Sequence, residues 1–454
     1  MSRIKDAAAF VVGKAMLAGM RLLGKSGYHL PGMYAYRLSP TVFNFIAKPK
    51  DVVFITGTNG KSTTTALVRH ILQTAGHKVA SNTESNTQPG IIAGLLRSTT
   101  IFNRSKADVM VLETSEEALP KVVATIRPQT VLLTNIQRDT YQVNLSPNYI
   151  YDKICGALGD DMTLWLNNED PHILSLERRF PKTHVYSMAG NDYSQAPDSS
   201  PFAVTQPCPI CQQPIVFDQL NLPSIGQFHC SACDLRSHGD ADVRGSAFDL
   251  DKGTITIGQR TFPMHYRAPH FAYNYLLAYA YAKSRGISDD TIERAFDSFT
   301  NIDGRLETQQ LDATRIHYSR FKQETPDTLQ SAIDLICLDP GPKTVLVDLH
   351  LVDNMPWGPR FAESGYAYDA NFEKLAGANV SRFICTGSVI GYDAANRLRY
   401  AGVDPELIEV LPTDDPADFV RALRSDQPNE AYILAYLGYY KKIRKAITHA
   451  ATDH

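Results

Sequence analysis

A glycine-rich sequence near the start of the chain, Gly57-Thr-Asn-Gly60-Lys61-Ser62-Thr63, constrains the fold more than any other feature. It follows a short apolar run, residues 51–56, which predicts a buried strand, and it opens a stretch of helical spacing over residues 63–75. In that order, backbone N–H groups of the turn and the helix N-terminus can surround phosphate oxygens. The lysine can reach the outer phosphates, and the following hydroxyl can ligate Mg²⁺. A general phosphate loop has four residues between its glycines, whereas this one has two. The strand before the loop and the helix after it nevertheless argue against the alternative, a plain turn.

The rest of the chain alternates between strand-like and helical patterns. Strand-like runs at 109–113, 130–134 and 163–166 predict a parallel sheet in a doubly wound α/β domain. Residues 190–245 are rich in Pro, Ser, Asp and Gln and indicate a small insertion. Helical spacing returns at 272–285, and Asn301-Ile-Asp-Gly-Arg305 has the composition of a hinge. Further strand-like runs indicate a second α/β domain and lie at residues 344–349, 382–386 and 431–435.

Three parts are therefore expected. Residues 1–48 form an N-terminal amphipathic helical segment, 49–300 a central ATP-binding domain with an insertion at about 200–240, and 301–454 a C-terminal α/β domain. Glu113 ends the strand-like run 109–113, where the nucleotide crevice of an open α/β sheet is found. We expect Glu113 to hold Mg²⁺ between the phosphates. A helix-capping acid is the alternative.

Four of the seven cysteines form two Cys-x-x-Cys pairs with 18 residues between them, Cys208 with Cys211 and Cys230 with Cys233. This spacing predicts one zinc ion held by four thiolates. A tetrahedron filled by thiolates leaves no position for water, so the zinc would be structural. A redox pair or two disulfides is the alternative, disfavoured in a reducing compartment. Residues 208–233 contain no Lys or Arg, and the net charge is −3, so the composition predicts no nucleic-acid partner.

The N-terminal residues 1–26 carry Arg3, Lys5, Lys14, Arg21 and Lys25 among apolar side chains. No uncharged run approaches the ~20 residues that a membrane span requires, and no secretory signal is recognisable, so a cytoplasmic protein is expected. The pattern fits a basic amphipathic helix that could rest on an anionic membrane surface. The alternative is a helix packed on the first domain with its lysines in water.

The stretch from Thr56 to Thr65 closely resembles the phosphate loop of the Mur ligases, a family that includes folylpolyglutamate synthase. Further segments resemble the MurT branch, the synthetase subunits of lipid II isoglutaminyl synthase, and the cysteine insertion lies between them. These segments are Leu30-Pro-Gly32, Asn82-Thr-Glu84, 134–139, 167–171, Tyr273-Asn274, Gly304-Arg305 and 368–373. The resemblance runs from about residue 25 to the end.

The resemblance implies an ATP-binding central domain carrying a zinc ribbon, a C-terminal Mur-type domain and a separate GatD-like glutaminase subunit. The pair would amidate the α-carboxyl of D-glutamate in lipid II. Lys61, Ser62 and Glu113 would handle phosphates and Mg²⁺. Asn135 and Asp139 would line the acceptor side, Asn274 would contact adenine and Arg305 would meet phosphate across the cleft. The residues expected to bind ATP are Gly57, Thr58, Asn59, Gly60, Lys61, Ser62, Thr63, Asn274 and Arg305.

Two segments depart from the family pattern. After Asp139 the chain reads Thr140-Tyr-Gln-Val-Asn144, where the family has an acidic segment containing Arg and Gly. Residues 352–363 stand where the family has an Asp that completes the Cys–His pair of its glutaminase partner. Counting back from Tyr368-Asp369, that position is held by Glu363, with Asp353 as the fallback. The alternative for Glu363 is a solvated loop acid.

The remaining cysteines, Cys155, Cys337 and Cys385, lie in apolar segments and are expected to be buried rather than nucleophilic. Ammonia would then come from solution or from a second subunit. Some Mur ligases bridge Mg²⁺ with a carbamylated lysine; Lys153 is the candidate here, with an ordinary surface lysine as the alternative. Two other functions are open: a folylpolyglutamate-type or other amide ligase, and a non-enzymatic zinc-ribbon ATPase or interaction module.

Overall fold

The apolar runs at 51–56 and 109–113 form neighbouring parallel strands, β1 (Asp51–Thr56) and β3 (Val109–Glu113), as predicted. Alternate residues of β1 enter different cores, because successive side chains of a strand point to opposite faces. Val53 and Ile55 face one core, and Val52 and Phe54 face the other. The central sheet is therefore buried on both faces, as parallel sheets are.

The computed structural model describes residues 2–82, 87–139, 146–197, 206–300, 306–319, 325–350 and 364–452. Its central sheet has nine strands in the order β11-β10-β9-β6-β5-β4-β1-β3-β2, and only β9, β10 and β11 pair antiparallel. The strands not yet named are β2 (Val79–Ser81), β4 (Thr130–Leu133), β5 (Thr163–Asn167), β6 (Thr183–Met188), β9 (Val243–Asp249), β10 (Thr254–Ile257) and β11 (Arg260–Pro263). The sequence patterns did not predict β9–β11, which extend the sheet beyond the insertion.

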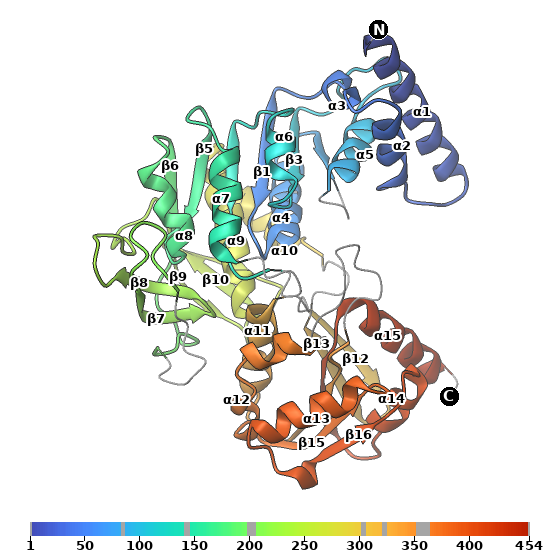
Figure 1. Ribbon diagram of the computed structural model, residues 1–454, viewed down its shortest axis with the longest axis vertical. Coiled ribbons are helices and arrows are strands. Elements are labelled where there is room, and N and C mark those ends of the chain that lie inside the picture. The colour runs from blue at the N-terminus through green and yellow to red at the C-terminus, as the bar shows by residue number, and fades with distance from the viewer. Residues whose placement is uncertain are drawn as a thin grey trace.

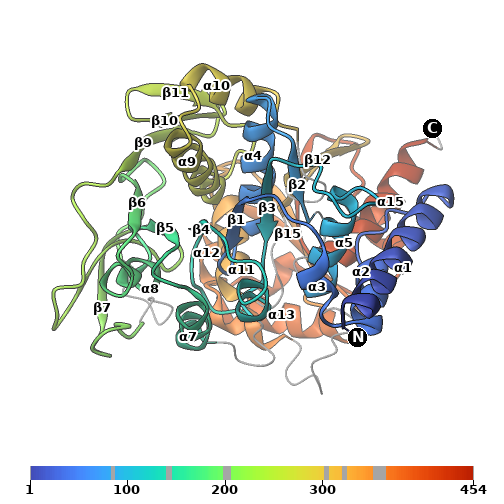
Figure 2. The same ribbon diagram turned by 90° about the horizontal axis from the view of Figure 1, so that it is seen from above.

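Helices cover both faces of this sheet, which Figure 2 shows nearly edge-on. One face carries α4 (Lys61–Thr74), α9 (Pro269–Ser284) and α10 (Asp289–Asp297). The other carries α5 (Gln88–Ser98), α6 (Leu119–Val123) and α7 (Pro147–Ala157). The short α8 (Pro171–Leu174) and η2 (Ser175–Arg178) follow β5.

The N-terminal segment is helical, with α1 (Ser2–Leu22), α2 (Leu30–Leu38) and α3 (Val42–Phe45). Helix α1 buries Phe10 and Leu17 in the core shared with α5. Its one acid, Asp6, is buried and accepts hydrogen bonds of 2.6 Å from both Ser39 and Thr41. Helix α1 is thus packed on the central domain through one face. In the part of the chain that is described, no helix is both long enough and apolar enough to cross a membrane.

The C-terminal domain is a second α/β unit, below the central domain in Figure 1. Its six-stranded sheet has the order β12-β13-β17-β14-β15-β16, parallel except for the β12–β13 pair. The strands are β12 (Leu306–Leu311), β13 (Thr314–Ser319), β14 (Lys343–Val347), β15 (Val380–Thr386), β16 (Ile408–Leu411) and β17 (Asn429–Leu434). The helices are α11 (Pro326–Cys337), η3 (Gly365–Asp369), α12 (Glu373–Ala376), α13 (Ile390–Tyr400), η4 (Pro405–Leu407), α14 (Pro416–Leu423) and α15 (Leu437–Thr452).

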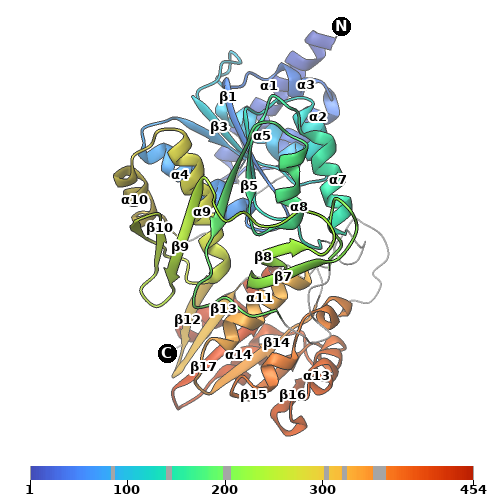
Figure 3. The ribbon, with the colours of Figure 1, turned by 90° about the vertical axis from the view of Figure 1, so that its left-hand side faces the viewer.

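The insertion contains an antiparallel hairpin, β7 (Ile215–Leu222) and β8 (Ile225–Cys230). Figure 3 shows this hairpin at the side of the central sheet, directly above α11 of the C-terminal domain. The hairpin therefore lies where the two domains meet.

Candidate nucleotide site and metal centre

The glycine loop connects β1 to α4, as the sequence predicts. Gly57 and Gly60 have φ angles of +122° and +82°, a region that residues with a Cβ rarely occupy. A Cβ at Gly60 would lie 2.3 Å from Oδ1 of Asn274, and one at Gly57 would lie 2.3 Å from Oγ1 of Thr134. Both the turn and the close approach of neighbouring side chains therefore require glycine at these positions.

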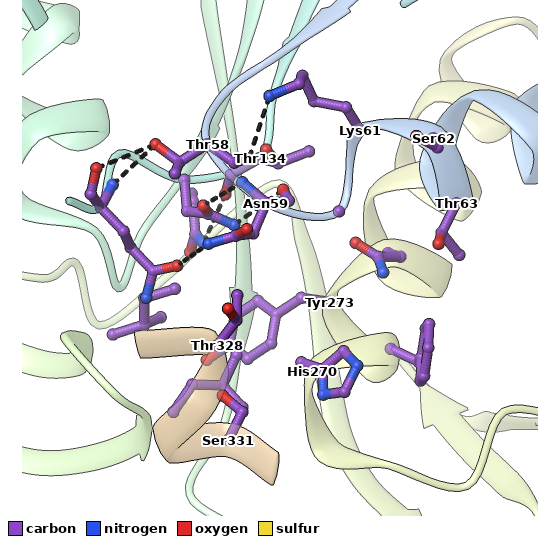
Figure 4. A pocket seen from close by; sticks show the side chains of 18 of the residues that line it. Thr58, Asn59, Lys61, Ser62, Thr63, Thr134, His270, Tyr273, Thr328 and Ser331 are labelled. Atoms are coloured by element: carbon purple, nitrogen blue, oxygen red, sulfur yellow. Dashed lines mark hydrogen bonds between the residues drawn. The ribbon is translucent and has the colours of Figure 1, made fainter. Parts of the chain in front are cut away.

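The segment that follows β4 holds the phosphate loop in place through several hydrogen bonds (Figure 4). Oδ1 of Asn135 accepts from the backbone N–H of Asn59 at 2.9 Å, and Nδ2 of Asn135 donates to the Asn59 carbonyl at 3.1 Å. Nδ2 of Asn59 donates to Oε1 of Gln137 at 2.7 Å, and the backbone N–H of Gln137 donates to Oγ1 of Thr58 at 3.0 Å. Asn135, expected on the acceptor side, is thus held against the phosphate loop.

Lys61 is buried in the first turn of α4 and is paired with a residue that the sequence reasoning missed. Its Nζ donates to the carbonyls of Gly57 and Thr58 and lies 3.1 Å from Oε1 of Glu116. Glu116 is itself only 7% exposed. One signal in the sequence could have identified Glu116. It is an acid three residues after Glu113, close to the edge of the sheet that faces the crevice.

Ser62 and Glu113 lie side by side. Oγ of Ser62 donates to Oε1 of Glu113 at 2.9 Å. The backbone of Glu113 is fixed by Asn82, whose side chain donates to its carbonyl at 2.7 Å and accepts from its N–H at 2.8 Å. Two oxygens this close, on rigid elements beside a phosphate loop, form a suitable pair of ligands for one Mg²⁺ ion.

A cleft of about 1200 Å³, part of it open to solvent, extends from the phosphate loop to the C-terminal domain. Asn274 and Tyr273 reach it from α9, and Oγ1 of Thr64 donates to Oδ1 of Asn274 at 3.3 Å. Figure 4 shows Thr328 and Ser331 of α11 facing the loop across the cleft. The lining residues are Thr58–Thr63, Glu113, Thr134, Asn135, Gln137, Asn167, Tyr186, Leu222, Ile225, His270, Phe271, Tyr273, Asn274, Ser319, Thr328 and Ser331. The contribution of Leu222 and Ile225, from the hairpin, has no signal in the sequence.

Asp139 lies at the domain interface, where Oγ1 of Thr325 donates to its Oδ1 at 3.3 Å. Its neighbour Arg138 forms an ion pair with Asp369 of the C-terminal domain. Lys153 lies with its ammonium 5.2 Å from the ring centre of Tyr149 and does not line the cleft. Three further predicted residues, Arg305, Glu363 and Asp353, lie outside the described residues.

The four insertion cysteines converge, with their Sγ atoms all within 4.8 Å of one another. Sγ of Cys208 lies 3.7 Å from that of Cys233, and Sγ of Cys211 lies 3.4 Å from that of Cys230. Backbone N–H groups donate to these sulfur atoms, that of Ile210 to Sγ of Cys208 and those of Ala232 and Cys233 to Sγ of Cys230, and such bonds favour the thiolate form. A thiolate there is the form that binds a metal.

Comparisons with known proteins agree with this geometry. Residues 55–231 match the Mur ligase middle domain, and residues 323–438 match the MurT ligase C-terminal domain. The chain is 26% identical over 407 residues to a subunit MurT of lipid II isoglutaminyl synthase (glutamine-hydrolyzing) from Staphylococcus aureus strain N315, covering 88% of this chain and 89% of that one. It is also 26% identical over 444 residues to the corresponding subunit from Streptococcus pneumoniae, covering 95% of this chain and 94% of that one.

Solved structures show the same fold. A pseudomurein peptide ligase type C from Methanothermus fervidus aligns with a TM-score of 0.69 at 18% identity, covering 91% of this chain and 81% of that one. MurF from Acinetobacter baumannii aligns with a TM-score of 0.63 at 12% identity, covering 92% of this chain and 80% of that one. The fold and the phosphate loop are thus those of the Mur-type ligases, which are ATP-dependent. The chain belongs to the Mur ligase family, and its C-terminal domain belongs to the MurT branch of that family.

Proposed function

We propose that this chain is the synthetase subunit of a glutamine-dependent amidotransferase that amidates the D-glutamate α-carboxyl of lipid II. The observation that carries the proposal is a cleft in which a Mur-type phosphate loop faces a C-terminal domain of the MurT kind. Relatives named as lipid II isoglutaminyl synthase subunits, similar over most of their length, support the substrate.

The reaction needs ATP because a carboxylate has no leaving group that ammonia can displace. A carboxylate oxygen attacks the γ-phosphorus of ATP and ADP leaves, which gives an acyl phosphate. The lone pair of ammonia then attacks the acyl carbon and inorganic phosphate leaves. The protein positions the reactants and neutralises charge. Lys61 would bind the outer phosphates, and Ser62 and Glu113 would hold Mg²⁺.

The described residues support an external source of ammonia. Burial raises the pKa of Cys337 to about 11 and that of Cys385 to about 12. Burial also raises the pKa of Cys155. These thiols are poor nucleophiles, so glutamine hydrolysis would belong to a GatD-like partner. Glu363, or Asp353, would supply the carboxylate that orients the partner's histidine.

The four-cysteine cluster fits a structural zinc ion. Four sulfur ligands with backbone N–H groups directed at Cys208 and Cys230 match a closed thiolate site. The hairpin β7–β8 begins and ends at this cluster, so the metal would hold its strand ends together.

The outer face of α1 would rest on the anionic inner face of the membrane, where lipid II is embedded. Ile4 and Leu22, at the two ends of α1, are 78% and 89% exposed, and Leu23, just beyond the helix, is 74% exposed. The nearby basic residues Arg3, Lys5, Arg21 and Lys25 are exposed as well. Co-sedimentation with anionic vesicles should fall for Leu22→Glu and not for Val389→Glu, at a 75% exposed apolar position that precedes α13. Equal sedimentation of both variants with the parent would remove the membrane contact from the proposal.

The test of the proposed activity is incubation of the chain with ATP, Mg²⁺, lipid II and ammonium. An amidated lipid, detected by mass spectrometry, is the expected product. ADP formed with no change in the lipid would instead favour an amide ligase for a different substrate.

A further inference from the structure

The turn of the ribbon hairpin, residues 222–225, lies at the far end of the hairpin from the cysteines. The pairing register fixes this, because Ile215 pairs with Cys230 at one end and Leu222 pairs with Ile225 at the other. The cysteine end accounts for metal binding. The turn end makes contacts that a metal-binding module would not require.

The first group of contacts leads to the phosphate loop. Leu222 and Ile225 line the cleft, and Ile225 is only 2% exposed. The carbonyl of Pro223 accepts from Nε2 of Gln137 at 2.8 Å, and Oε1 of Gln137 accepts from Nδ2 of Asn59 at 2.7 Å. Two consecutive hydrogen bonds therefore connect the phosphate loop to the hairpin turn.

The second contact leads to the C-terminal domain. Oγ of Ser224 donates to Oδ1 of Asp327 at 2.6 Å. Asp327 lies in the first turn of α11, the helix that also contributes Thr328 and Ser331 to the cleft. Ser224 has a φ of +62°, an unfavourable conformation for a residue with a Cβ, so its surroundings hold it there.

The hairpin is also anchored to the central domain, so the turn cannot move independently of the phosphate loop. Nδ2 of Asn221 donates to the hydroxyl of Tyr273 at 3.0 Å, and Nε2 of Gln227 donates to the buried Glu169 at 3.0 Å. At Gly226 a Cβ would lie 1.9 Å from the carbonyl oxygen of Gln219, so only glycine allows the strands to approach this closely. The turn is a rigid part of the central domain that reaches the other domain.

We propose that the turn 222–225 is part of the nucleotide site: Leu222 and Ile225 pack on the nucleoside end of ATP, and Ser224 positions the C-terminal domain over the nucleotide through Asp327. The inference rests on the proposed ATP site. Among its polar and charged lining the cleft contains three apolar side chains, Leu222, Ile225 and Phe271, and apolar surface of this kind suits a flat apolar base. Ser224 and Asp327 are positioning residues and do not touch the reacting atoms.

The experiment measures binding of a non-hydrolysable ATP analogue with Mg²⁺ to the full chain by titration calorimetry. Ser224→Ala should weaken binding about tenfold, because the hydrogen bond to a carboxylate is lost. Ser224→Gly tests the hydroxyl separately, since glycine tolerates the positive φ, and it should weaken binding to a similar degree. Ser246→Ala, at an exposed position of strand β9, is the matched control and should bind like the parent chain.

A double-mutant cycle separates positioning from general damage. Ser224→Ala combined with Asp327→Ala should weaken binding no more than either variant alone, because both remove the same contact. Steady-state ATP turnover should show a raised KM with a nearly unchanged kcat. Additive losses, or equal affinity of the parent chain and both Ser224 variants, would overturn the inference. No binding by the parent chain would instead overturn the ATP site itself.

Discussion

Nζ of Lys61 lies 3.1 Å from Oε1 of Glu116, and both side chains are almost wholly buried. The phosphate-loop lysine is thus paired with an acid of its own domain, at the end of the cleft where a triphosphate would bind. A triphosphate bound there would compete with Glu116 for Lys61. Glu116 would then determine how much of the lysine's charge is available to the nucleotide.

Glu116→Gln should lower the free energy of unfolding by about 3 kcal/mol, because it leaves a buried ammonium without its opposite charge. Added ATP supplies negative charge to Lys61, so the nucleotide should raise the Tm of the variant more than that of the parent. Differential scanning fluorimetry with and without ATP measures both effects. Glu117→Gln is the control, since Glu117 is exposed; a Glu116 variant that behaves like it would argue against the pairing.

Lys61→Ala should weaken ATP binding by about 1.5–3 kcal/mol or more, the size of a charge-assisted hydrogen bond to phosphate. Titration calorimetry gives the affinity, and circular dichroism checks that the variant folds. Normal ATP hydrolysis and normal amidation by this variant would show that the loop is not the nucleotide site.

The elements that could be predicted from sequence are those with a strong local pattern. The run 109–113 is strand β3 residue for residue, because an apolar run that is buried on both faces is easily recognised. The cysteine spacing anticipated that the four thiols converge. The contacts of Glu116, Gln137 and Ser224 could not be predicted, because their partners lie 55, 86 and 103 residues away in the chain and only the tertiary fold brings them together.

Metal analysis should find close to one zinc ion per chain. Cys230→Ser should lose the metal, because removing one thiolate breaks the tetrahedral set. Cys385→Ser, at a buried cysteine outside the cluster, is the control and should retain it. A parent chain without zinc, purified without chelators, would contradict the ribbon assignment.

Acid sensitivity should depend on His172. Burial lowers its pKa from 6.5 to about 4, and its Nδ1 has no hydrogen-bond partner among the residues that the structure describes. The folded state therefore resists protonation of His172. Its contribution to the free energy of unfolding is fully present above pH 6.5 and is lost as the pH falls toward 4, a total of about 3 kcal/mol. His172→Phe keeps a ring against Tyr151 and cannot be protonated. The Tm of the His172→Phe variant should fall less than that of the parent chain between pH 7 and pH 5. If the Tm of both falls equally with pH, His172 is not the source of the acid sensitivity.

Glu363→Ala should abolish amidation driven by glutamine in the two-subunit complex and leave amidation driven by ammonium nearly intact. The synthetase chemistry is assigned to Lys61 and Glu113, whereas Glu363 would act only on the partner's histidine. Assays with both nitrogen sources distinguish the two. Equal loss with both sources would place Glu363 in the synthetase site or the fold, and no loss with either would make Asp353 the next variant to test.

The most direct test of the central claim follows the oxygen atoms. Lipid II carrying ¹⁸O in the D-glutamate α-carboxyl is incubated with the chain, ATP, Mg²⁺ and ammonium, and the released phosphate is analysed by mass spectrometry. An acyl phosphate intermediate transfers one carboxylate oxygen to the phosphate, so the account predicts ¹⁸O in the inorganic phosphate and in the amide. Amidated lipid with phosphate free of ¹⁸O would contradict activation of the carboxylate by ATP.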